Sequence, residues 1–207
     1  MSLQRGERQT QRTKEALTRA FVQLIHEKNY KAITINDIVD RANTGRSTFY
    51  RYFQSKADVL LSLHEGIFDR LSLGLSSASD WLANEPPPQF VMLLQRYQQY
   101  DNIPVSFLYE LGNDVDYVVP RMEALLSLQF EESLRRSFSE DDSSIPFSVL
   151  ARSIAGTYSW LIRCWFMERR TFTPDQVAEH IHRLTRAAIR EAFDERDEIH
   201  TVYNKSS

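Results

Sequence analysis

The sequence predicts an all-α protein of about nine helices, and three observations support this fold class. The chain has 207 residues but only six Gly and seven Pro, so few residues interrupt long helices. Apolar residues recur at three- and four-residue steps, as they do on the buried face of a helix. No segment is a convincing β-strand, and the chain contains no internal repeat.

The first three predicted helices are compatible with one small domain. An apolar stripe indicates a helix over residues 9–28. Thr34 is a good N-cap for a second, shorter helix. Residues 43–45 then form a tight turn, in which Gly45 supplies backbone freedom and Thr44 is suited to cap the next helix. This third helix covers residues 46–53, about two turns.

The rest of the chain is predicted to form a second, larger helical domain. A fourth helix of some six turns begins at Lys56, and Asn84-Glu85-Pro86-Pro87-Pro88 is the strongest break after it. Thr173 followed by Pro174 is a good helix start. The expected domains are 1–55 and 56–207, joined by the long fourth helix. The further helices are expected at residues 88–101, 103–112, 116–138, 146–170 and 174–194, with a polar loop at 139–144.

Charge is distributed unevenly along the chain. The total is −3, but residues 1–60 hold eleven Lys and Arg against six Asp and Glu, a balance of +5. Residues 61–207 hold fourteen against twenty-two, a balance of −8. A basic N-terminal domain on an acidic remainder favours an anionic partner for the first domain.

The segment TGRSTFYRYFQSK, from Thr44 to Lys56, carries the functional signal. Two short helices separated by a tight turn describe a helix-turn-helix. Phe49 and Phe53 are four residues apart, so they share one face and can pack on the first helix. Arginines on the opposite face can reach a base edge or a phosphate. The residues predicted to be exposed there are Arg46, Ser47, Thr48, Tyr50, Arg51 and Tyr52, and Thr34 and Lys56 are predicted phosphate contacts at the starts of neighbouring helices.

This domain resembles the DNA-binding domain of the TetR/AcrR transcriptional regulators, over about residues 12–61. The resemblance is carried by KNYKAITINDIVDRANTGRSTFYRYFQSKADVL, from Lys28 to Leu60. Two places depart from the family pattern: its Gly-Val-Ser turn reads Asn43-Thr44-Gly45, and its Gly before Thr48 is Ser47. The resemblance implies that DNA is contacted by Thr34, Thr44, Arg46, Ser47, Thr48, Tyr50, Arg51, Tyr52 and Lys56.

The resemblance also implies a helical regulatory domain that dimerises and binds a small ligand. Aromatic residues that could line a ligand pocket are Trp81, Tyr97, Phe107, Tyr109, Phe130 and Trp160. In the family the last two helices form a four-helix interface with those of a second copy. The residues expected there are Ile154, Tyr158, Leu161, Trp165, Ile181, Leu184 and Ala188. The expected assembly is a two-fold homodimer on a palindromic operator.

The predicted function is a cytoplasmic repressor that leaves its operator when a small ligand binds. The alternative is a coactivator or protein-interaction module of the same fold without an operator of its own. Enzymatic activity is not expected, because no nucleophile–base or metal-binding pattern is present. The single cysteine, Cys164, excludes an intrachain disulfide. We expect no cofactor, no metal and no membrane segment.

Overall fold

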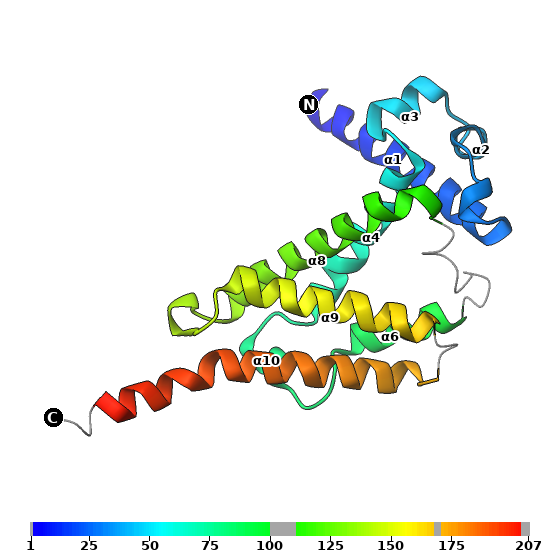
Figure 1. Cartoon of the computed structure of the whole chain (residues 1–207). Helices are drawn as coiled ribbons and strands as arrows, with labels where there is room; N and C mark the ends of the chain where they lie inside the picture. Colours follow the sequence, from blue (N-terminus) through cyan, green and yellow to red (C-terminus); the bar gives the residue numbers. More distant parts are fainter. Residues whose placement is uncertain (1, 100–110, 168–170, 204–207) are drawn as a thin grey trace. The chain divides into compact units, whose positions relative to one another are not determined.

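The structure, a computed structural model, describes residues 2–99, 111–167 and 171–203 (Figure 1). Every regular element in these ranges is a helix, which confirms the predicted all-α class. The predicted helix at 103–112 falls almost entirely outside the described residues. Two compact units can be distinguished, and each is described by itself.

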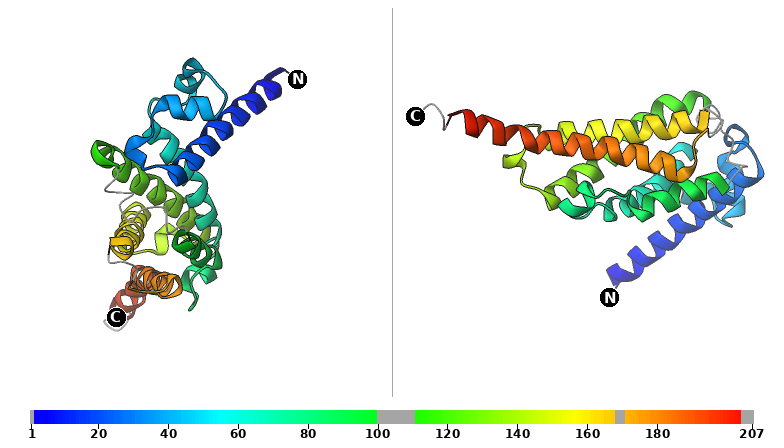
Figure 2. Two further views of the ribbon diagram at one scale, coloured as in Figure 1. Left: turned by 90° about the vertical axis from the view of Figure 1, so that its right-hand side faces the viewer. Right: turned by 90° about the horizontal axis from the view of Figure 1, so that it is seen from below.

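The first unit contains the three predicted N-terminal helices. They are α1 (Ser2–Glu27), α2 (Ile35–Arg41) and α3 (Arg46–Tyr52), with a 3-10 turn η1 (Tyr30–Ala32) between the first two. α1 is longer than the predicted 9–28, because it begins at Ser2. Helix α1 packs against α2, and α2 packs against α3 (Figure 2). The core includes Leu17, Phe21, Ile38 and Phe49, all fully buried.

The border of the first unit differs from the predicted border at residue 55. The first unit extends to Gly66, within α4 (Lys56–Leu73). Among the described residues it also includes 111–121, which form η2 (Gly112–Asp114) and the start of α8 (Val115–Ser137). A segment far downstream in the sequence therefore belongs to the same compact unit as the helix-turn-helix.

The second unit contains the remaining helices. They are the end of α4, α5 (Ala78–Leu82), α6 (Pro88–Gln99), most of α8, η3 (Glu140–Asp142), α9 (Phe147–Met167) and α10 (Pro174–Tyr203). Helices α9 and α10 lie side by side, and α6 packs against α10 (Figures 1 and 2). Aromatic side chains fill the core of this unit, among them Trp81, Phe90, Phe130 and Phe147.

Helix α4 is shorter than the six turns that its apolar stripe predicts. It ends at Leu73, and a separate helix α5 begins after Ser77, whose side chain forms a capping box with Asp80. Gly74 lies at the break, where an added Cβ would be 2.9 Å from the Cβ of Pro87. Only glycine permits this close approach of two chain segments, so the bend at Gly74 is built into the packing.

The last helix begins where the sequence predicts, but it ends later than predicted. Thr173 caps α10 as predicted, because its Oγ1 accepts a hydrogen bond of 3.2 Å from the amide of Gln176. The Gln176 side chain in turn accepts one of 2.9 Å from the amide of Thr173, which completes a capping box. The sequence predicts the other end near residue 194, whereas α10 continues to Tyr203.

Candidate nucleic-acid interface

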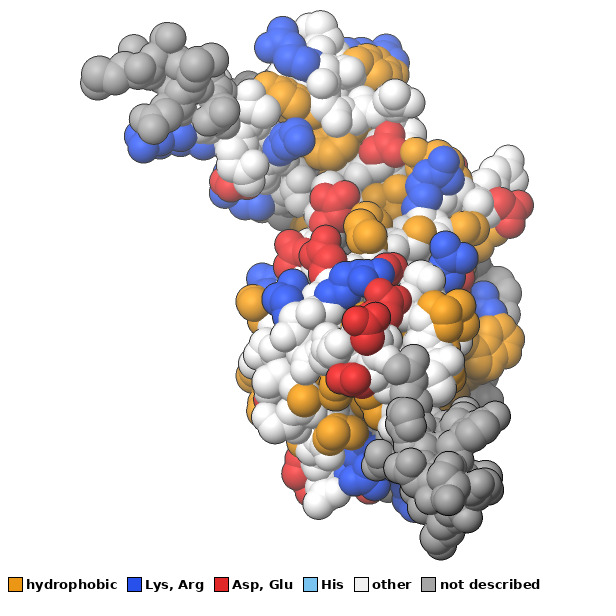
Figure 3. Space-filling model, turned by 90° about the vertical axis from the view of Figure 1, so that its left-hand side faces the viewer, with side chains coloured by type: hydrophobic (Ala, Val, Ile, Leu, Met, Phe, Trp, Pro, Cys, Tyr) orange, Lys and Arg blue, Asp and Glu red, His pale blue; other side chains and the backbone are white. Residues whose placement is uncertain are grey.

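Helix α3 is divided into a buried face and an exposed face. Phe49 and Phe53 are 0% and 6% exposed, and their ring centroids are 5.8 Å apart, which confirms their predicted core role. The opposite face presents Arg46, Ser47, Tyr50 and Arg51 to solvent. Basic side chains of the first unit reach the surface in the upper part of Figure 3. Thr48 and Tyr52, for which the sequence predicts exposure, are half-buried.

Tyr52 is half-buried because it lies against α1. A hydrogen bond with Thr10 is the main cause that lowers the pKa of Tyr52. This contact joins the end of α3 to the first half of α1. The hydroxyl of Tyr52 therefore has a structural partner within the unit as well as its predicted role toward DNA.

The turn before α3 uses Asn43, not Gly45, for its unusual backbone conformation. Asn43 has a φ of 49°, whereas Gly45 has a φ of −97° and is the N-cap of α3. The expected need for glycine at position 45, and the expected capping by Thr44, are therefore wrong. Asn is the non-glycine residue that best tolerates the left-handed region, and it occupies the place of the family's usual Gly. This departure from the family pattern keeps the turn intact.

An Asn43→Val variant should be less stable than the wild-type chain by about 1–2 kcal/mol, because a β-branched side chain clashes with the backbone at positive φ. Asn43→Gly is the matched control and should stay within about 1 kcal/mol of wild type. Urea unfolding followed by circular dichroism measures both. Equal stability of the two variants would contradict the role assigned to Asn43.

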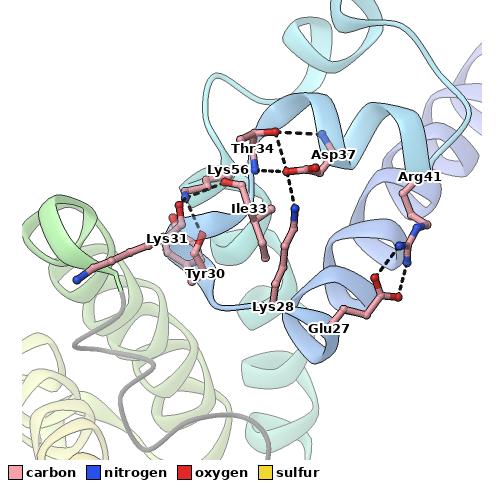
Figure 4. A network of polar contacts seen from close by, with 9 residues as sticks. All are labelled: Glu27, Lys28, Tyr30, Lys31, Ile33, Thr34, Asp37, Arg41 and Lys56. Carbon is pink, nitrogen blue, oxygen red and sulfur yellow. Dashed lines mark hydrogen bonds and ion pairs between the residues drawn. The ribbon is translucent and has the colours of Figure 1, made fainter.

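Helix α2 is fixed at both ends by polar contacts (Figure 4). At its start, Thr34 forms a capping box with Asp37, and Lys28 lies 2.8 Å from the Asp37 carboxylate. Lys28 and the hydrogen bonds from Thr34 hold the pKa of Asp37 well below its usual range. At its end, Arg41 makes two hydrogen bonds of 2.7 Å to Glu27 of α1. Thr34 is thus a helix cap whose side chain remains exposed.

Lys56 is turned toward the protein in this structure (Figure 4). Its Nζ donates to the carbonyl oxygens of Tyr30 at 2.7 Å and Ile33 at 2.9 Å, and it lies 3.4 Å from that of Lys31. The ammonium group also lies 4.2 Å from the centroid of the Tyr30 ring. Burial lowers the pKa of Lys56. The side chain predicted to contact a phosphate instead binds the carbonyls around η1.

The structure brings two of the predicted pocket residues together in the core of the second unit. Trp81 and Phe130 are fully buried, with ring centroids 5.8 Å apart. Tyr97 is half-buried and packs against Phe166, and burial raises its pKa to about 12. Trp160 is 57% exposed and lies outside the buried cluster that holds Trp81 and Phe130. Phe107 and Tyr109 lie outside the described residues.

Two buried polar groups lie in the aromatic core of the second unit. The Trp81 Nε1–H has no hydrogen-bond partner within the described part of the chain. The Tyr158 hydroxyl is buried too; burial raises the pKa of Tyr158, and a hydrogen bond with Thr185 lowers it in part. Phe130 links them, because its ring centroid is 5.0 Å from that of Tyr158. The hydroxyl of Thr185 also donates to the Ile181 carbonyl. Buried donors without a partner are rare in proteins and call for an explanation.

The predicted dimer residues fall into two groups. Ile154, Tyr158, Trp165 and Ile181 are at most 3% exposed and belong to the core, so their assignment to an interface is corrected. The sequence shows apolar residues around more than one face of α9 but does not indicate which face is the core. The other three remain accessible: Leu184 is 54% exposed, and Leu161 and Ala188 are half-buried.

The described ranges contain neither a candidate metal-binding cluster nor a candidate membrane-spanning helix. No group of three or more His, Cys, Asp or Glu side chains there could hold a metal ion. None of the helices in those ranges is both long enough and apolar enough to cross a membrane.

Comparison with known proteins agrees with the geometry of the first unit. Residues 14–63 match the family described as bacterial regulatory proteins, tetR family. The chain is 31% identical over 121 residues to the HTH-type transcriptional regulator YxbF of Bacillus subtilis, covering 56% of this chain and 31% of YxbF. It is 32% identical over 105 residues to DhaS, the dhaKLM operon transcriptional activator of Lactococcus lactis, covering 51% of this chain and 53% of DhaS. The matches thus span about a third to a half of these relatives.

A solved structure is similar in fold to most of the chain. A TetR-family transcriptional regulator from Syntrophomonas wolfei superposes with a TM-score of 0.61, over 86% of this chain and 96% of that one, at 17% sequence identity. The similarity in fold covers both units, whereas the family match covers the helix-turn-helix. The family match therefore lies in the N-terminal helix-turn-helix, where residues 14–63 are similar to the tetR family of bacterial regulatory proteins.

Proposed function

We propose that the protein is a transcriptional regulator that binds operator DNA as a homodimer and is controlled by a small ligand. One observation carries the DNA-binding part of this proposal. The buried Phe49 and Phe53 hold α3 in place, and the opposite face presents arginine and hydroxyl side chains. This is the arrangement that a helix needs in order to enter a major groove.

The exposed side chains receive separate roles in this proposal. Arg46 and Arg51 read base edges, for which guanidinium groups have the matching geometry. Ser47, Thr48 and Thr44 allow close approach of the helix. Tyr50 and Tyr52 donate to phosphates, as does the exposed hydroxyl at the start of α2, Thr34.

The proposed dimer uses the exposed face of α9 and α10. Val149, Trp160 and Met167 on α9 are 51%, 57% and 46% exposed. Together with Gly156 they follow one another at steps of seven, four and seven residues, so they lie on one face of the helix. Apart from its chain neighbours and the adjacent backbone of α9, no atom lies within 4 Å of the place where a Cβ of Gly156 would be, which leaves room for a partner helix. A row of large apolar side chains exposed in this way is characteristic of an interface.

The proposed effector binds in the second unit near Trp81 and Tyr158. The buried N–H of Trp81 lacks a partner in the described residues, and the surrounding side chains are aromatic. A largely apolar or aromatic molecule with a hydrogen-bond acceptor would satisfy this donor. We propose repression relieved by this ligand; activation, the activity of the relative DhaS, is the other outcome of a reporter assay.

The test is a titration of the purified chain with promoter DNA from beside its own gene, at several salt concentrations. The logarithm of the association constant should fall with the logarithm of salt by about 0.9 for each phosphate contact. Arg51→Ala should weaken operator binding by roughly tenfold to a hundredfold and non-specific binding far less. Arg19→Ala, which removes an exposed arginine of α1, is the control and should retain the discrimination.

Two results would contradict the proposal. A salt slope near zero would exclude phosphate contacts as the basis of binding. A shift of promoter DNA that requires a second protein would favour the coactivator alternative instead.

A further inference from the structure

Two side chains near the start of α8 are hydrogen-bonded to the two ends of the helix-turn-helix. Asp114, the last residue of η2, accepts a hydrogen bond of 2.7 Å from the hydroxyl of Tyr30. Tyr117, in the first turn of α8, donates one of 2.7 Å to Oδ1 of Asp58. Tyr30 precedes α2, and Asp58 follows α3. All four residues lie in the first unit.

The Tyr30 end of this arrangement is firmly anchored. Tyr30 is 1% exposed, and its ring meets the ring of Phe21 edge-on at 6.2 Å. Its carbonyl oxygen accepts the 2.7 Å hydrogen bond from Lys56. Burial and the bond to Asp114 raise the pKa of Tyr30, so its hydroxyl remains a donor. Asp114 therefore contacts the residue that joins η1 to the start of α4.

The Asp58 end fixes the segment that directly follows α3. Oδ2 of Asp58 accepts hydrogen bonds from the backbone amides of Gln54 at 2.9 Å and Ser55 at 2.8 Å. This leaves Oδ1 for Tyr117. The guanidinium of Arg121 lies 3.7 Å from the centroid of the Tyr117 ring, which holds that ring in place.

The backbone of η2 also approaches η1 closely. Gly112 has a φ of +57°, and a Cβ placed there would be 3.0 Å from Cε of Lys31. The neighbouring side chains Leu111 and Val118 are 3% and 0% exposed. The segment 111–118 is therefore packed into the first unit as well as hydrogen-bonded to it.

We propose that Asp114 and Tyr117 are positioning residues for DNA binding, which set the orientation of α2 and α3. They act on both ends of the helix-turn-helix through Tyr30 and Asp58. Base recognition requires side chains held within about 0.5 Å of their places, whereas non-specific binding depends on charge. Helix α8 also carries Phe130, whose ring packs against Trp81 and Tyr158 of the proposed effector site. The proposal rests on the proposed DNA-binding function.

The experiment compares full-length variants under conditions where circular dichroism shows each to be fully folded. Tyr117→Phe removes one donor and keeps the ring, and Asp114→Ala removes one acceptor. Asp114→Asn keeps an acceptor and serves as the conservative rescue. Asp116→Ala removes an exposed carboxylate of the same helix turn and is the control.

Tyr117→Phe and Asp114→Ala should each raise the operator Kd about tenfold, the effect of one lost hydrogen bond to a charged group. The Kd for non-specific DNA should change less than about twofold, because the phosphate-binding charges are retained. Asp114→Asn should recover most of the operator affinity, and Asp116→Ala should behave as wild type. A drop in melting temperature with an unchanged operator Kd would overturn the proposal, because these contacts would then only stabilise the fold.

Hydrogen exchange supplies a readout that does not depend on DNA. The amides of α2 and α3 should exchange faster in Tyr117→Phe and Asp114→Ala than in Asp116→Ala. Unchanged exchange would overturn the positioning role. If the wild-type chain binds no operator but exchange increases as expected, the proposed function fails while the positioning contacts stand.

Discussion

A Trp160→Glu variant is expected to be monomeric at protein concentrations where the wild-type chain is dimeric. Trp160 is 57% exposed and lies in the middle of the apolar row on α9. Removing a central tryptophan from an interface commonly costs about 2–4 kcal/mol, and an unpaired carboxylate adds to this cost. The dimer Kd should therefore rise by roughly a hundredfold or more. Sedimentation equilibrium measures this constant directly.

The same variant should lose operator affinity through the loss of the dimer. One short helix contacts only a few base pairs, so tight binding needs two half-sites occupied together. The control is Leu128→Glu, which places a carboxylate on α8 at a leucine that is 55% exposed. This control should remain dimeric and bind the operator normally. Dissociation of the Leu128→Glu dimer, or a stable Trp160→Glu dimer, would place the interface elsewhere.

The helix-turn-helix was predictable because its information is local. The four-residue spacing of Phe49 and Phe53 correctly predicts their burial, and Thr34 is a helix cap by residue type and position. Which residue takes the left-handed conformation in the turn was not predictable from the same segment. Asn43 and Gly45 both tolerate it, and residue type alone favours glycine.

Local residue spacing and residue type do not predict contacts between residues that are distant in the sequence. Tyr30 and Asp114 are 84 residues apart, and nothing in their local sequence marks them as partners. On α9, helical spacing indicated broad apolar coverage but did not distinguish the core face of Tyr158 from the exposed face of Trp160. That choice depends on how α9 packs against its neighbours, which is tertiary information.

Lys56→Met is expected to destabilise the first unit by about 2 kcal/mol, the scale of hydrogen bonds to a charged group. The methionine keeps much of the aliphatic stem but leaves the carbonyl oxygens of Tyr30 and Ile33 without their donor. It also removes the cation over the Tyr30 ring. If Lys56 keeps its hydrogen bonds to these carbonyls when DNA is bound, the salt slope of DNA binding should keep its wild-type value in the variant. Urea unfolding and salt-dependent titrations test the two statements separately.

The family resemblance assigns Lys56 to a phosphate, and the same variant distinguishes that role. A phosphate contact would make the salt slope smaller by about 0.9 and leave stability nearly unchanged. Lys14→Met removes an exposed lysine of the same unit and corrects for the loss of one charge from the first unit. The carbonyl-bound ammonium would have to break at least two hydrogen bonds shorter than 3 Å to reach DNA. We therefore expect the loss of stability to be the larger of the two effects.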